Sequence, residues 1–298
     1  MSTMPFAITA AGPVGDAVDQ LVSWLLTHGP SLFSLIQGLV QGLASLFEAL
    51  LAAPPAWLLA LLVSGLGLWR VSGGFALFSL LGLNLVLFMG LWEPMIATLA
   101  LVVTASLLAL LIGLPIGVLA ARQRTIWSLV RPVLDLMQTM PAFVYLIPAV
   151  MFFSTGQVPS VIATLIFSMP PVVRLTVLGI REVPADRLEA GMSFGCSPSQ
   201  LLWKVQLPSA LPTLMAGVNQ TIMLALSMVV IASMIGGGGL GDVVLRGIQQ
   251  LNVGLGFEGG LAVVILAVIL DRLTQSLATP PAKGLAERWR DWRRLWSD

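Results

Sequence analysis

Long apolar runs separated by short polar segments dominate this chain. A helix needs about 20 apolar residues to cross the roughly 30 Å hydrocarbon core of a bilayer. The first run is shorter than this and the other six come close to it or exceed it. The runs predict spans near residues 55–69, 74–92, 95–121, 132–153, 158–178, 210–235 and 257–277. The pattern therefore predicts an all-α integral membrane protein with about seven transmembrane helices.

The segment before these spans, residues 31–53, has helical periodicity with two faces. Its apolar stripe contains Leu32, Ile36, Leu39, Leu43, Leu46 and Leu50, and its polar stripe contains Ser34, Gln37, Gln41, Ser45 and Glu48. Such an amphipathic helix either lies in the membrane interface or packs against the bundle. Both placements stay open at this point.

Composition agrees with a membrane class. The 298 residues are 57% hydrophobic and 10% charged, whereas a soluble domain is about 25% charged. We read no signal peptide in residues 1–20, which lack Lys and Arg. With one cysteine, Cys196, and one histidine, His28, the chain can form neither an intrachain disulfide nor a Ser-His-Asp or Cys-His catalytic site of the usual kind at either residue.

The basic residues fall on one side of the predicted membrane. They cluster after spans one, three, five and seven, and Arg246 is the exception. The positive-inside rule then places the N-terminus outside and the C-terminus in the cytoplasm. The tail, residues 280–298, mixes Trp289, Trp292 and Trp296 with five basic residues, which favours an inner-leaflet lipid anchor over nucleic-acid binding.

Charge is scarce inside the predicted spans. No Asp, Glu, Lys, Arg or His occurs in residues 95–121, 136–153 and 208–240. Their absence argues against a proton relay through these spans, but sodium binding by backbone carbonyls stays possible. The chain also lacks the G-x-x-x-x-G-K-[ST] sequence that cradles nucleotide phosphates. A pump built on this chain would therefore take its energy from a partner.

Two glycine motifs have structural interpretations. The run Gly236–Gly241 fits a dinucleotide fingerprint, but it follows an apolar span and no strand–helix unit surrounds it, so we read it as a flexible or close-packed turn. The G-x-x-x-G at Gly113–Gly117 predicts close packing of two helices.

A semi-polar insert, "EAGMSFGCSPSQLLWKVQLP" at 189–208, interrupts the apolar pattern. Gly195 is a natural stop for a first short helix, since glycine accepts the left-handed conformation. Ser197, Pro198 and Gln200 then form the start of a second helix with a capping box, and Leu207-Pro208 is expected to end it. The insert is either a plain capped connector or a knuckle that a partner grips, with Leu188, Met192, Leu201 and Leu202 as its apolar surface.

This insert resembles the EAA loop of ABC-importer permeases, whose pattern is E-A-A, three residues, G, nine residues, I-x-L-P. Glu189 and Ala190 open the match, Gly195 follows at the right interval, and Val205, Leu207 and Pro208 close it. Gly191 stands where the pattern has its second Ala, and Val205 where it has Ile. The resemblance implies that residues 182–208, including Ser197 and Pro198, dock on an ATP-hydrolysing subunit.

Longer stretches at 131–148, 170–190 and 211–248 resemble the permease subunit of glycine betaine/L-proline ABC importers. The resemblance implies a type I importer core at 95–279, preceded by an outer region at 1–53 and two further spans at 54–94. It implies a second copy of the permease, two ATPase subunits that bind ATP and Mg, an external solute-binding protein, no cofactor in this chain and an inner-membrane location.

The solute path is the least determined part. A quaternary ammonium group can be held by aromatic faces, and Phe143, Tyr145, Phe152 and Phe153 in the fourth predicted span are the candidates. Choline, carnitine, proline or another small solute stays possible as cargo. So do two other classes, an ion-coupled carrier or channel and a membrane scaffold that moves nothing.

Overall fold

The computed structural model describes residues 12–278, which are helical and contain no β-strand. The elements are α1 (Pro13–His28), α2 (Pro30–Ala52), α3 (Ala56–Arg70), α4 (Gly73–Phe88), α5 (Trp92–Arg122), α6 (Arg124–Thr139), η1 (Ala142–Tyr145), α7 (Leu146–Phe153), α8 (Gln157–Ser168), α9 (Pro170–Arg181), α10 (Ala185–Ser193), α11 (Pro198–Leu201), η2 (Leu202–Gln206), α12 (Leu207–Ser233), α13 (Gly239–Gln249) and α14 (Val253–Ala278). The all-α prediction is confirmed. The basic C-terminal tail predicted as a lipid anchor lies outside the described residues.

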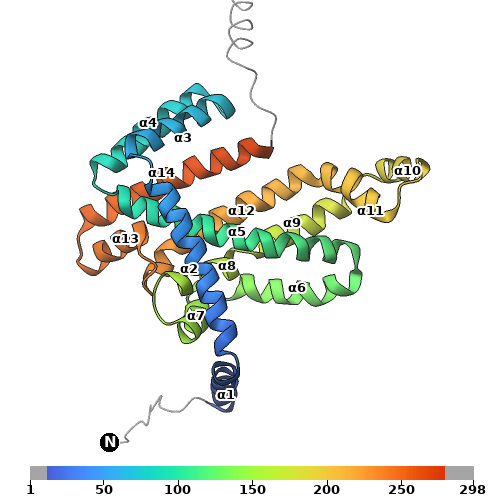
Figure 1. Ribbon diagram of the computed structural model, residues 1–298, viewed down its shortest axis with the longest axis horizontal. Coiled ribbons are helices and arrows are strands. Elements are labelled where there is room, and N and C mark those ends of the chain that lie inside the picture. Colours follow the sequence, from blue (N-terminus) through green and yellow to red (C-terminus); the bar gives the residue numbers. More distant parts are fainter. Residues whose placement is uncertain (1–11, 279–298) are drawn as a thin grey trace, which may run out of the picture.

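The long helices form one bundle with distinct ends. α9 packs against both α5 and α12, and α12 also packs against α8 and α14. Figure 1 shows α10 and α11 projecting from one end of this bundle, while α13 lies at the opposite end. The short pair α3 and α4 lies beside α14. The candidate site at 182–208 is thus held away from the bundle centre.

Five helices among residues 12–278 are long and apolar enough to cross a membrane, or six if a bent pair counts as one span. They are α2, α5, α8–α9, α11–α12 and α14, with α6 and the η1–α7 segment as the bent pair. α3 and α4 occupy the first two predicted spans but have 15 and 16 residues, fewer than the roughly 20 that a full crossing needs. The seven predicted segments are all helical, although not all reach full spanning length.

α2 packs against the bundle, which is one of the two placements that the sequence left open. α2 runs across α5 (Figure 1), and it buries Val40 and Ala44 there. Within the apolar stripe, Ile36 packs against the main core, whereas Leu32, Leu39, Leu46 and Leu50 are exposed. The helix is apolar over more than one face, so the smaller residues provide the tight contact and the leucines remain outside it.

The predicted span at 132–153 is not one helix. α6 already begins at Arg124 and ends at Thr139, and the chain then bends by 111° into the η1–α7 segment. Met140 has an extended backbone (φ −71°, ψ 136°) because the ring of the following Pro141 disfavours a helical residue before it. Proline chemistry, which the hydrophobic pattern does not register, therefore breaks this span.

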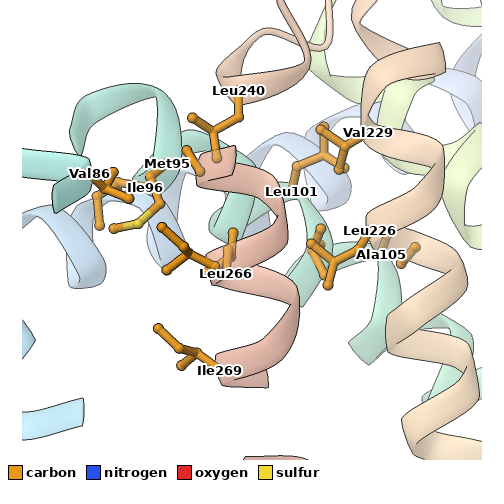
Figure 2. Packing of buried hydrophobic residues seen from close by; sticks show 14 of the residues in the cluster. Val86, Met95, Ile96, Leu101, Ala105, Leu226, Val229, Leu240, Leu266 and Ile269 are labelled. Atoms are coloured by element: carbon orange, nitrogen blue, oxygen red, sulfur yellow. The ribbon is translucent and has the colours of Figure 1, made fainter. Parts of the chain in front are cut away.

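The main hydrophobic core joins α4, α5, α12, α13 and α14. Figure 2 shows Val86, Met95, Leu101, Leu226 and Leu266 among the side chains that meet there. Each of them is buried. The core ties the helix that leaves the candidate site, α12, to the centre of the protein.

Small residues set the close helix contacts, as the sequence predicted. A Cβ added at Gly113 would lie 2.6 Å from Val172 Cγ1, and one at Gly117 would lie 2.6 Å from Thr176 Cβ, so α5 and α9 approach through these glycines. The turn at Gly236–Gly241 is also close-packed, since a Cβ at Gly239 would lie 2.4 Å from Thr98 Oγ1.

We expect Gly117→Val to lower the thermal stability of the detergent-purified protein, because overpacking of this kind costs about 1–3 kcal/mol. Gly260→Ala in α14 is the matched control, since nothing lies within 4 Å of a Cβ there. The control should be neutral or slightly stabilising. Equal melting temperatures for Gly117→Val and the wild type would contradict the close-packing account.

Candidate functional site, a two-helix knuckle

The knuckle, residues 182–208, begins with α10, which ends as the sequence predicted. Gly195 has φ +75°. Its N–H donates to Met192 O at 2.9 Å, and the N–H of Cys196 donates to Gly191 O at 3.1 Å. These two bonds form a Schellman motif, which pairs the last carbonyls of the helix and reverses the chain.

α11 begins with the predicted capping box. The backbone N–H of Gln200 donates to Ser197 Oγ at 3.3 Å, and the N–H of Ser197 donates to Gln200 Oε1 at 2.9 Å. Pro198 occupies the first turn, where backbone N–H groups have no acceptor within the helix, so the N–H that proline lacks costs no hydrogen bond. The start of α11 is therefore specified by local chemistry.

The end predicted for this second helix, at Leu207-Pro208, was wrong. α11 continues through the π-helical turn η2 directly into α12, and residues 198–233 form one helical stretch. Within η2 the N–H of Leu207 donates to Leu202 O, five residues back. A proline ring normally clashes with the carbonyl four residues earlier, and the wider π turn relieves that clash at Pro208.

The two halves of the knuckle meet at Gly191, which is buried. A Cβ there would lie 2.7 Å from Leu201 Cδ1 and 3.4 Å from Val205 Cγ2. The two departures from the EAA pattern, Gly191 and Val205, thus lie next to each other, and both replace a larger residue by a smaller one. They let α10 approach η2 closely.

The base of the knuckle is anchored in the bundle. Ile180, Leu202 and Ala210 form a buried cluster, with Val118 of α5 packed against it. Leu202, predicted as part of the outer apolar surface, is 3% exposed and belongs to this anchor. The π turn rotates η2 so that Leu202 points inward.

Charged side chains brace the same region. The Arg181 guanidinium donates to Ala120 O at 2.8 Å and Ala121 O at 3.3 Å. It therefore pairs carbonyls in the last turn of α5, where a positive charge is also favoured by the helix dipole. Arg187 Nη1 donates to Ser209 Oγ at 3.1 Å and ties α10 to α12.

The outer face of the knuckle exposes three large apolar side chains. Phe194, Trp203 and Met192 are 89%, 66% and 56% exposed, and Glu189 is exposed beside them. An open groove of about 530 Å³ lies between α10 and η2, lined in part by Phe194 and Lys204. Sequence reasoning missed Phe194 and Trp203, although large aromatics in the polar part of a loop were the available signal.

The four aromatic path candidates have different surroundings. Phe143 of η1 is 53% exposed. Tyr145 is buried and donates to Met137 O, while Phe152 stacks on Phe33 of α2 with ring centroids 4.8 Å apart, and Phe153 meets the same ring edge-on at 5.8 Å.

The described residues offer no obvious place for a metal. Among residues 12–278, no group of three or more His, Cys, Asp or Glu side chains could hold an ion.

Comparisons with known proteins agree with this geometry. Residues 113–279 match the family described as binding-protein-dependent transport system inner membrane component. The glycine betaine transport system permease protein OpuAB of Bacillus subtilis is 48% identical over 89% of this chain and 94% of its own length. The glycine betaine/proline betaine transport system permease protein ProW of Escherichia coli is 50% identical over 93% of this chain and 78% of its own.

A solved structure shows the same fold. A chain of the MetNI methionine ABC transporter in an inward-facing conformation superposes with a TM-score of 0.57 and 22% identity, over 61% of this chain and 91% of that one. At this identity the likeness extends to the fold alone. With the family match over more than half of its length, the chain belongs to the binding-protein-dependent transport system inner membrane components, as a multi-pass permease of the type I ABC-importer fold.

Proposed function

We propose that this chain is the permease subunit of an ATP-driven importer of glycine betaine- or proline betaine-type compatible solutes. The observation that carries the proposal is a capped knuckle whose second helix continues without a break into the bundle. The relatives named above support the cargo. The chain itself catalyses no reaction in this scheme.

The partners follow from the exposed surfaces and the family. ATP and Mg would bind to a pair of ATPase subunits, each taking Phe194, Trp203 and Met192 of one knuckle into a groove. An external solute-binding protein would deliver the solute to two copies of the permease. Exposed leucines on the long helices would contact lipid.

The charge distribution supports an orientation. Arg122 and Arg124 flank the junction of α5 and α6, and Arg187 and Lys204 lie on the knuckle. Figure 1 shows this junction and the knuckle toward the same end of the bundle, and the ATPase would meet the knuckle in the cytoplasm. Because cytoplasmic loops carry the excess of Lys and Arg, this end faces inward. The N-terminus is then outside and the C-terminus cytoplasmic.

Transport would occur by alternating access. Closure of the ATPase pair on ATP would move both knuckles, and α12 would follow because it shares one helix with α11 and η2. The bundle would exist in two conformations, one open to each side of the membrane, and the ATPase would shift the equilibrium between them. The buried base around Leu202 and the Arg181 brace keep the knuckle from bending instead.

A quaternary ammonium solute would need few fixed contacts on the way. Of the four aromatic candidates, Phe143 is the one whose ring is mostly exposed, so we propose it as the contact for the ammonium group by a cation–π interaction. Tyr145, Phe152 and Phe153 would support it through packing. Tight binding would belong to the external protein.

The proposal is tested by uptake of labelled glycine betaine into proteoliposomes that hold this permease with its ATPase and binding protein. We expect uptake that requires ATP on the ATPase side and is insensitive to sodium and proton gradients. Uptake that follows a gradient without ATP would contradict the proposal. If only a binding protein loaded with choline or carnitine stimulated the ATPase, the proposed importer mechanism would stand and the proposed solute would be wrong.

Gly195→Val should leave the permease inserted but uncouple uptake from ATP hydrolysis. The left-handed backbone at this position costs a β-branched residue about 1–2 kcal/mol or more, so the turn between α10 and α11 would deform. Gly195→Asn is the control, since asparagine tolerates this conformation better. Wild-type uptake by the valine variant would show that the backbone conformation at Gly195 is not needed for coupling.

Phe194→Ala should weaken binding of the ATPase subunit by about 1–3 kcal/mol, or roughly 5–150-fold in Kd, because the ring is proposed to fill a pocket there. Phe194→Leu retains an apolar side chain and should lose less. Binding of the purified ATPase to permease in nanodiscs measures both. Unchanged affinity in the alanine variant would mean that the partner contacts another face.

A further inference from the structure

α6 divides into three faces along its length. Trp127, Val130, Leu134 and Met137 face the bundle and pack around Val172 and Val173 of α9. Leu129, Val133 and Leu136 form a second, exposed apolar face. Arg124, Ser128, Arg131, Asp135 and Gln138 form a third face, which is exposed and polar throughout and is called the polar stripe below. The spacings of three and four residues keep each face continuous.

Lipid does not suit the polar stripe. Asp135 lies eleven residues after the start of α6, or about 16 Å along its axis. Charged side chains at membrane depth almost always face a bundle interior or a water-filled cavity. The separate leucine and valine face already provides α6 with a lipid-compatible surface.

The charges on the stripe meet α9. Arg174 Nη2 lies 2.5 Å from Asp135 Oδ1, and Arg131 Nε lies 4.0 Å from Asp135 Oδ2. These side chains remain 36% (Arg174), 53% (Asp135) and 66% (Arg131) exposed, so the ion pair is accessible. A groove of about 360 Å³ opens beside it, lined also by Trp127, Leu178 and Arg181. Three arginines and one aspartate give the groove an excess of positive charge.

We propose that the polar stripe of α6 is a wall of the aqueous solute path, and that the Asp135–Arg174 pair is a transient site for small zwitterions. This inference rests on the proposed function and assigns a place in this chain to the solute. The solute carboxylate binds Arg174 and Arg131, and its cationic group faces Asp135.

The ion pair suits a zwitterion for an electrostatic reason. A molecule that brings one charge of each sign can separate Asp135 from Arg174 and give each a new partner. A simple cation can pair only with Asp135, and it then competes with Arg174 and Arg131 for that one carboxylate. The same net positive charge opposes leakage of inorganic cations.

The first test measures which face of α6 meets water. Single cysteines replace Ser128 and Gln138 on the polar stripe and Leu129 and Val133 on the apolar face, in permease assembled with its ATPase. A charged methanethiosulfonate reagent is added, and labelling of the α6 peptide is read by mass spectrometry, so Cys196 can remain. We expect Ser128→Cys and Gln138→Cys to react at least roughly tenfold faster, because the reactive thiolate forms only where water reaches.

Equal and slow labelling at all four positions would overturn the proposal, because the stripe would then be sealed in a protein interface or in lipid. Faster labelling of Leu129→Cys and Val133→Cys than of the stripe variants would overturn it too. This test does not use transport, so its outcome is independent of whether the wild-type complex imports glycine betaine.

The second test separates a solute site from a merely structural ion pair. Arg131→Gln, Arg174→Gln and the double variant Asp135→Asn/Arg174→Gln are compared in ATP-driven glycine betaine uptake at saturating binding protein. If the pair were only structural, removal of both charges would leave no unpaired charge, and the double variant would regain the uptake that the single variant Arg174→Gln loses. We expect all three variants instead to lose about tenfold or more of the maximal uptake rate, in line with a lost charged contact.

Wild-type uptake by the double variant would overturn the solute site. Arg131→Gln keeps the proposal testable if the double variant fails to assemble, since Arg131 is the more exposed partner, and wild-type uptake by Arg131→Gln would likewise count against the site. Arg122→Gln, at the end of α5 and outside the groove, is the matched control and should keep wild-type uptake. Absence of uptake by the wild type would contradict the proposed function, whereas the labelling test above would still decide whether the polar stripe meets water.

Discussion

A proline inside a helix is the constraint on which the rest of this structure depends. Pro208 cannot donate a backbone hydrogen bond, and in a regular α-helix its ring would collide with the carbonyl of Lys204. The π turn η2 widens the helix before it, and Leu207 pairs with Leu202 O. The chain therefore passes from the knuckle into α12 as one helical body, which a helix break at this position would prevent.

The remaining contacts of the knuckle follow from that continuity. The rotation of η2 buries Leu202 at the base and leaves Trp203 outside, and the closeness of α10 to η2 is possible because Gly191 has no side chain. Arg181 holds the end of α9 to the end of α5. At Pro141, by contrast, no such widening occurs, and the fourth span bends by 111°. The helix thus continues through Pro208 with the help of a π turn, whereas it ends before Pro141.

Local chemistry in this chain was predictable and global packing was not. The capping box at Ser197 and the left-handed stop at Gly195 each depend on a few neighbouring residues, and both were predicted from the sequence. The close approach of α5 and α9 at Gly113 was also predicted, because a G-x-x-x-G motif marks it. The burial of Leu202, the continuity through Pro208 and the packed face of α2 depend on helix phase and on partners far along the chain. A hydrophobic pattern gives neither, since it records how apolar a segment is and not which side meets a neighbour.

The central claim is that the knuckle and α12 move as one body when the ATPase closes. Spin labels measure this most directly. A label on Cys196 reports the distance between the two copies of the proposed permease dimer, and a second label at an introduced Ser227→Cys on the exposed side of α12 reports the distance within one copy. ATP binding should change the Cys196 distance between copies and leave the distance from Cys196 to position 227 unchanged. A change within one copy, with the distance between copies constant, would contradict the claim.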